Sequence, residues 1–172
     1  MTKSPTNKRF IKIFLILYLS NNGTYEELSM SALRLAYPTL SPDAYKGLID
    51  CKNALNKSGL GKELVELVYL RVSQINGCAF CLDMHANSLR SSGVSNKKID
   101  TLAGWQVSHH FDPKERAALA WTEAVVNIAT SGTSDELFET LKTHFTDVQI
   151  SDLTIAIGLM SAFNRIAIAL RQ

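Results

Sequence analysis

The sequence has few of the residues that interrupt helices or cross-link small domains. Its 172 residues include 4 prolines, 9 glycines and 3 cysteines. Three cysteines are too few for a disulfide-stapled secreted scaffold, and their odd number is typical of a reducing compartment, so we expect a cytoplasmic protein. The sequence also lacks an excess of charge of one sign, since it has 18 basic and 16 acidic residues. The net charge of +2 gives no electrostatic basis for binding nucleic acid or an anionic membrane.

The sequence is rich in apolar residues, and these recur at helical spacing. Hydrophobic residues make up 46% of the chain and charged residues 20%, which allows one domain with a substantial core. No alternating stretch is long enough to predict a strand. The fold class is therefore all-α, a bundle of about seven helices. They are expected near residues 41–59, 62–76, 78–92, 95–104, 112–128, 134–145 and 147–170, the first with Ser41 as its N-cap.

Residues 1–31 are predicted to be an N-terminal extension, and residues 32–172 the main domain. Basic residues precede the apolar run 10–19, as in a signal peptide, but Lys12 interrupts the run and no small-residue cleavage site follows it. The run is also too short to span a bilayer. Two interpretations stay open: a translation start placed too early, upstream of Met30, and an apolar arm that covers a neighbouring subunit.

The most informative motif is Cys78-Ala-Phe-Cys81, followed by His85. On a helix, these three residues stand at i, i+3 and i+7 and share one face. The two thiols are then close enough to bridge. Vicinal thiols with an adjacent base are either a redox centre or half of a metal site.

Glu66 is predicted to be the partner of His85. A chain reversal at Gly77 would make the helices before and after it antiparallel, and His85 would lie about 12 Å from the turn. The matching level of the preceding helix is near residues 66–69, where Glu66 is the only acidic residue. Glu66 could then hydrogen-bond the imidazole and raise its basicity, and His85 could take a proton from Cys81.

The start of a helix is a favourable place for thiol chemistry. Free backbone N–H groups and the helix dipole are expected to lower the pKa of Cys78 and Cys81. A thiolate attacks the O–O bond of a peroxide, and the sulfenic acid that results is captured by the second thiol. A structural zinc site would use the same two cysteines with His85 and needs a fourth ligand, for which His109 and His110 are candidates. We expect no metal and no cofactor.

The stretch from Glu66 to His85 resembles the alkylhydroperoxidase D-like proteins of the carboxymuconolactone decarboxylase superfamily. Gly104-Trp105 and the stretches 115–123 and 162–167 extend the resemblance, which runs from about residue 33 to the C-terminus. The resemblance implies an all-helical fold that assembles into trimers or hexamers. It also implies a peroxidase with a cysteine pair.

The resemblance further assigns roles to individual residues. It implies that Cys81 is the peroxidatic thiol, that Cys78 is the resolving thiol, and that Glu66 and His85 form a proton relay. This chain departs from the pattern at Phe80, where the best-characterised members carry a histidine, and phenylalanine cannot transfer a proton. The ring-opening decarboxylases of the superfamily do not use a cysteine pair, which argues against that activity here.

The sequence therefore predicts a peroxidase that reduces alkyl hydroperoxides through a Cys78–Cys81 disulfide, in antioxidant defence. Its partners would be a hydroperoxide substrate and an unidentified thiol or dithiol reductant, with no nucleic acid and no membrane. A thiol–disulfide oxidoreductase, a redox sensor and a structural zinc module are the alternatives. The nearly all-apolar segment 147–170 favours a homo-oligomer, since such a helix is buried in a domain or between subunits.

Overall fold

The computed structural model describes residues 33–172, which form helices and no strands. The all-α prediction is confirmed, whereas the expectations for residues 1–31 lie outside the described residues. In chain order the elements are α2 (Tyr37–Leu40), α3 (Pro42–Leu55), α4 (Lys62–Asn76), α5 (Ala79–Ser91), α6 (Asn96–Asp100), the 3-10 helix η2 (Leu102–Gly104), α7 (Pro113–Val126), α8 (Asp135–Lys142) and α9 (Asp147–Leu170).

All seven predicted helices are present, and the short α2 is an addition. No periodic pattern predicts α2, because it has only four residues and one of them is proline. Ser41 occupies the predicted N-cap position of α3, before Pro42, but its side chain makes no capping hydrogen bond. The reason is that Ser41 also ends α2: its backbone N–H donates to Tyr37 O at 2.9 Å, and its φ of −131° and ψ of 62° are not those of an extended N-cap.

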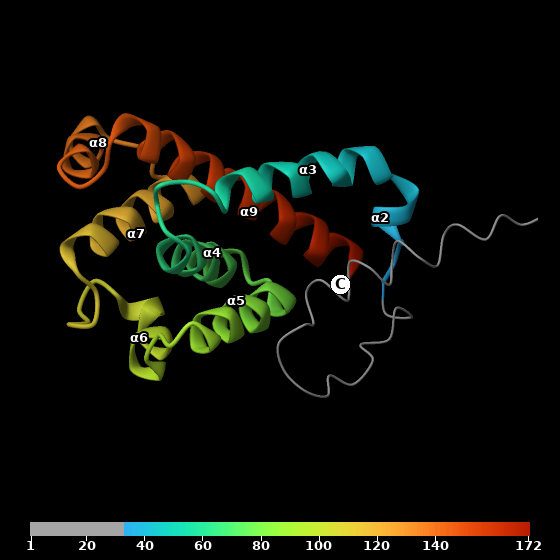
Figure 1. The fold of residues 1–172 in the computed structure, drawn as a ribbon, viewed down its shortest axis with the longest axis horizontal. Coiled ribbons are helices and arrows are strands. Elements are labelled where there is room, and N and C mark those ends of the chain that lie inside the picture. The colour runs from blue at the N-terminus through green and yellow to red at the C-terminus, as the bar shows by residue number, and fades with distance from the viewer. Residues whose placement is uncertain (1–32) are drawn as a thin grey trace, which may run out of the picture. The chain divides into compact units, whose positions relative to one another are not determined.

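Helix α4 lies at the centre of the bundle, with α5, α7 and α9 packed around it (Figure 1). Its residues divide between two hydrophobic clusters. Val68 and Val72 pack among side chains of α7 and α9, whereas Leu67 and Leu70 pack towards α5, α6 and η2. Because two sides of α4 are covered, 8 of its 15 residues are buried.

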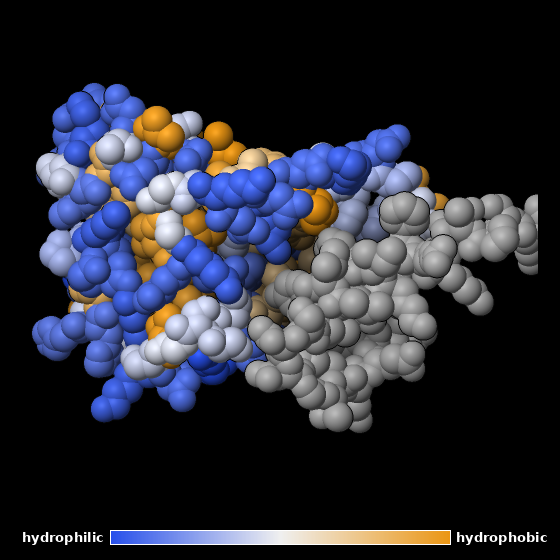
Figure 2. Space-filling view, viewed as in Figure 1, coloured by the Kyte–Doolittle hydropathy of each residue, from blue (hydrophilic) through white to orange (hydrophobic). Residues whose placement is uncertain are grey.

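Helix α9 combines a buried face with an exposed apolar stripe. Its 24 residues are long and apolar enough to cross a membrane by length and composition. One face, however, packs against α3, α4, α7 and α8, which is the position of a core helix. On the opposite face Val148 and Ile155 are exposed. Figure 2 shows apolar surface at the top of the view, over the first half of α9.

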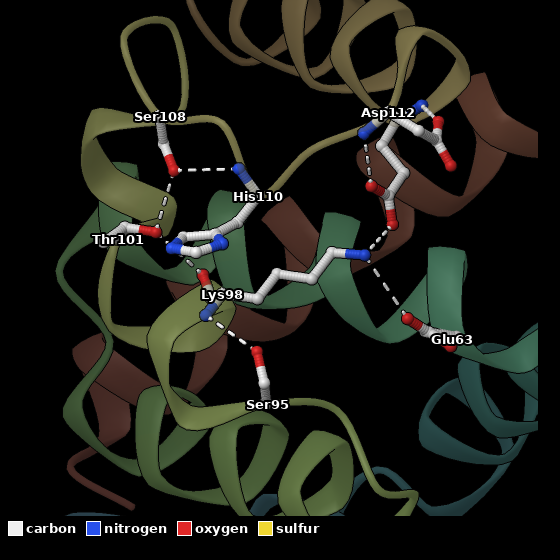
Figure 3. A network of polar contacts seen from close by, with 8 residues as sticks. Glu63, Ser95, Lys98, Thr101, Ser108, His110 and Asp112 are labelled. Atoms are coloured by element: carbon white, nitrogen blue, oxygen red, sulfur yellow. Dashed lines mark hydrogen bonds and ion pairs between the residues drawn. The ribbon is translucent and has the colours of Figure 1, made fainter.

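A partly buried charge cluster joins α4, α6 and α7 (Figure 3). The Lys98 ammonium donates to Glu115 and lies 3.5 Å from a carboxylate oxygen of Glu63. Glu115 also closes the capping box of α7 with Asp112, whose side chain accepts from the Glu115 N–H at 2.8 Å. Burial would lower the pKa of Lys98, but the carboxylates of Glu115 and Glu63 raise it. The protonated Lys98 ammonium therefore joins α4, α6 and α7 in the folded protein.

We predict that Lys98→Met destabilises the protein by about 1–3 kcal/mol at pH 7, because it leaves the buried Glu115 carboxylate without its cation. The value is below that of a fully buried pair because 17% of the Lys98 side chain stays exposed. Urea unfolding measures the difference. Lys97→Met is the control, since Lys97 is an exposed neighbour on the same helix and its loss should cost less than about 0.5 kcal/mol. Equal stability of the two variants would contradict the prediction.

Candidate functional site

A single left-handed residue reverses the chain between α4 and α5. Gly77 has a φ of 72° and a ψ of 34°, a conformation that side chains with a Cβ rarely adopt. Its N–H and that of Cys78 both donate to Ser73 O, at 2.9 and 3.1 Å. The last turn of α4 is closed in this way, and only two residues separate the end of α4 from the start of α5. The predicted antiparallel hairpin is therefore present.

The two thiols occupy different positions at the start of α5. Cys78 is the N-cap, and its Sγ accepts the backbone N–H of Cys81 at 3.4 Å. Cys81 lies in the first turn of α5, and its thiol packs with that of Cys78 in one buried cluster. Both side chains are buried and free, packed with Ala167 of α9 and beside Phe80. Their contact brings the pair within reach of a disulfide.

The expected hydrogen bond between Glu66 and His85 is present. His85 Nδ1 lies 2.8 Å from Glu66 Oε2, and the imidazole is buried, with its ring 5.2 Å from that of Tyr69. Burial would raise the pKa of Glu66, but His85, Ser88 and Lys52 together lower it. An ionised Glu66 accepts from Nδ1–H, which leaves the Nε2 lone pair as a base. Nε2 has no hydrogen-bond partner among the described residues.

The pKa of Cys81 runs against the expectation from the sequence. Burial first, and then the hydrogen bond and charge of Cys78, raise the pKa of Cys81 to about 12. Hydrogen bonds from the side chain of Asn164 and from the backbone lower it without cancelling that rise. The predicted lowered pKa is therefore wrong for the reduced protein, in which burial outweighs the helix N-terminus. Cys81 needs a base to ionise near neutral pH.

Two residues near the thiols were missed by the sequence analysis. Asn164 of α9 is a fully buried amide, and Tyr37 belongs to the unpredicted α2. Burial, Tyr45 and the thiols of Cys81 and Cys78 raise the pKa of Tyr37. A signal for Asn164 was available, because it is an amide in an otherwise apolar helical run. None was available for Tyr37, which is brought to the site by tertiary packing.

An open cavity of about 240 Å³ lies between the start of α5 and the end of α9. Cys78 and Phe80 line it on one side, and Ile168 and Arg171 on the other. Cys81 does not belong to the lining. A molecule in this cavity would therefore meet Cys78 before Cys81.

The ligands considered for zinc are not gathered at one point. Across residues 33–172, no group of three or more His, Cys, Asp or Glu side chains could hold a metal ion. His109 and His110 are exposed in the segment between η2 and α7, and His110 N–H donates to Ser108 Oγ at 3.3 Å. Nδ1 of His85 is engaged by Glu66. The donor set does not fit a tetrahedral site.

Comparison with known proteins places the chain in a family. The carboxymuconolactone decarboxylase family pattern matches residues 42–124. The uncharacterised protein YdfG of Bacillus subtilis is 34% identical over 80% of this chain and 93% of its own length. The alkyl hydroperoxide reductase AhpD of Bradyrhizobium diazoefficiens is 34% identical over 46% of this chain and 41% of its own.

The same relationship holds among solved structures. ATU0492 of Agrobacterium tumefaciens, a protein of unknown function and a candidate antioxidant defence protein AhpD, superposes with a TM-score of 0.78. It is 41% identical, and the match covers 81% of this chain and 96% of that one. The protein described here therefore belongs to the carboxymuconolactone decarboxylase family, as an AhpD-like member.

Proposed function

We propose that this protein is a cysteine-based peroxidase that reduces alkyl hydroperoxides. The observation that carries the proposal is the Glu66–His85 hydrogen bond of 2.8 Å, which orients a buried Nε2 lone pair one helical turn from Cys81. A second thiol, Cys78, is in contact with Cys81. Membership of a family that includes AhpD proteins supports the same chemistry.

The proposed reaction begins with removal of the Cys81 proton by His85 Nε2. The Cys81 thiolate attacks the terminal oxygen of the hydroperoxide, and the O–O bond breaks. The alkoxide takes the proton from His85 and leaves as an alcohol, and Cys81 becomes a sulfenic acid. Cys78 then attacks the Cys81 sulfur and releases water. One hydroperoxide is reduced to an alcohol and water while two thiols become one disulfide, which an external thiol or dithiol must reduce again.

Mixing the reduced protein with one equivalent of cumene hydroperoxide should consume two thiols and link Cys78 to Cys81. Peptide mapping and thiol titration measure both. In Cys78→Ser the reaction should stop at a Cys81 sulfenic acid that dimedone traps, and Cys81→Ser should be inactive. Cys51→Ser is the control, because Cys51 packs beside the main core and takes no part in the reaction. Free thiols after mixing would refute the two-thiol mechanism.

We further predict that Glu66→Gln slows peroxide reduction roughly 10²- to 10⁴-fold, the usual contribution of a positioned base. The amide can still accept from His85 Nδ1–H, but it cannot stabilise an imidazolium.

The same substitution should change how stability depends on pH. Because folding lowers the pKa of Glu66, ionised Glu66 stabilises the fold at pH values above its ordinary pKa of 4.5, and this contribution disappears as the pH falls through the folded pKa. The variant should lose that part of the acid dependence of stability. Unchanged pH–rate and pH–stability profiles would contradict both expectations and leave Glu66 without a role in the reaction.

A thiol–disulfide oxidoreductase is the second candidate, and the cavity is the observation that favours it. Cys78 lines the cavity and Cys81 does not, so an incoming disulfide would reach Cys78 first. The two functions differ in the thiol that starts the reaction. An oxidoreductase would reduce insulin disulfides, and Cys78→Ser would abolish its mixed disulfide. A peroxidase would instead keep its first chemical step in that variant.

We also propose that the protein is a homo-oligomer, a trimer or a hexamer in keeping with the resemblance, and that the exposed stripe of α9 lies in its interface. Val148 and Ile155 are the apolar residues of that stripe. Ile155→Lys should reduce the mass measured by light scattering at micromolar concentration, whereas Lys57→Ala, on an exposed turn, should leave the mass unchanged. A monomeric parent protein would refute the proposal. Cytoplasmic localisation stays a prediction.

A further inference from the structure

Arg171 follows α9 in a backbone conformation that an arginine side chain disfavours. Its φ of 53° and ψ of 65° are left-handed, and within residues 33–172 it is the one non-glycine residue with a positive φ. Glycine is the usual residue at such a helix end, because a Cβ makes the conformation costly. Strained residues of this kind cluster at functional sites. An arginine in place of glycine therefore points to a use of its side chain.

The end of α9 is anchored to α2 and to the residues before it. The Arg34 N–H donates to Leu170 O at 2.7 Å. The Tyr37 hydroxyl hydrogen-bonds the side chain of Gln172. These contacts hold the backbone on both sides of Arg171, whereas its guanidinium forms no hydrogen bond or ion pair with the residues that the structure describes. The cation is held in place and is available to a ligand.

Arg171 also lines the open cavity of about 240 Å³ beside the thiols. Among the described residues of the lining, it alone carries a charged side chain. Phe80 and Ile168 supply apolar surface, and Cys78 supplies a sulfur that is otherwise buried. The volume lies just below the roughly 300–1,000 Å³ of small-molecule sites. The cavity therefore combines a cation, apolar walls and the approach to Cys78, on a scale that suits a small organic molecule.

The disulfide of the proposed function needs a reductant that reaches one of its two sulfurs. Thiol–disulfide exchange requires the incoming thiolate to contact the sulfur that it attacks. Cys78 lines the cavity and Cys81 does not, so a small thiol in the cavity meets Cys78. A carboxylate on the same molecule would be attracted by Arg171, since a guanidinium matches the geometry of a carboxylate.

We propose that this cavity is the reductant site of the redox pair, that it takes a small thiol bearing a carboxylate, and that Arg171 binds this carboxylate while the thiolate attacks Cys78. The proposal rests on the Cys78–Cys81 disulfide of the proposed function. It does not depend on a peroxide as the oxidant that forms the disulfide.

The reaction is an exchange in two steps. The thiolate of the first small thiol bonds to Cys78 Sγ, and the bond between Cys78 and Cys81 breaks. Cys81 leaves with the electron pair and is protonated through His85. A second small thiolate then attacks the sulfur of the first, a small disulfide leaves, and Cys78 is protonated. Two small thiols are oxidised to one disulfide, their two protons pass to the cysteines, and the protein disulfide is reduced.

The test starts from protein whose Cys78–Cys81 disulfide has been formed with diamide, so no peroxide is needed. Three small thiols differ in charge: 3-mercaptopropionate is anionic, 2-mercaptoethanol is neutral and cysteamine is cationic. Acid quenching followed by iodoacetamide labelling measures the rate of disulfide reduction. For each thiol, the parent's rate constant is divided by that of a variant, so that the intrinsic reactivity of the thiol cancels.

Arg171→Gly is the principal variant, because glycine favours the observed backbone and should keep Tm at or above the parent value. Its ratio should be roughly two- to fivefold for 3-mercaptopropionate, the effect of an exposed ion pair, near one for 2-mercaptoethanol and below one for cysteamine. Salt at about 1 M should remove most of this difference. Arg165→Ala is the matched control, since Arg165 is an exposed arginine of α9 that does not line the cavity. Its three ratios should stay near one.

Equal ratios for the three thiols in Arg171→Gly would overturn the proposal. So would the same charge preference in Arg165→Ala, because net charge alone would then explain it. A trapped mixed disulfide of 3-mercaptopropionate that maps to Cys81 instead of Cys78 would also overturn it. If diamide forms the Cys78–Cys81 disulfide but cumene hydroperoxide does not, the peroxidase fails and the thiol series still decides on the reductant site. If neither oxidant forms the disulfide, both proposals are wrong.

Discussion

The left-handed backbone of Gly77 is the constraint on which the site depends. It allows α4 to end and α5 to begin with two residues between them, so the two helices run antiparallel from a fixed point. The level of each residue along one helix then determines its neighbour on the other, and Glu66 meets His85 for this reason. A β-branched or bulky residue at this φ would be strained, and the turn, the cap and the relay would move together.

Burial of the two thiols opposes the ionisation that their chemistry requires. Packing against α9 shields the thiols from water, but the same burial disfavours the thiolate that reacts. The side chain of Asn164 in α9 and the backbone at Cys81 act against this penalty.

Local sequence rules predicted the hairpin because its determinants are local. The bounds of α4 were predicted at residues 62–76 and are observed there, and counting levels from Gly77 placed Glu66 opposite His85. The error on the pKa of Cys81 has a different origin. It comes mainly from burial, to which Ala167 contributes from more than 80 residues away in the sequence. Neither the periodicity of α9 nor the CxxC motif contains that information.

The position of Cys78 as the N-cap of α5 ties the sulfur chemistry to the backbone. In the reduced protein its Sγ accepts the N–H of Cys81, one of the free donors at the helix start. In the proposed disulfide with Cys81 the sulfur would be a poorer acceptor in a changed direction, and the first turn of α5 would loosen. The solvent-exchange rate of the Cys81 amide hydrogen would then report the oxidation state of the pair, and a reductant would meet a helix end that has already begun to open.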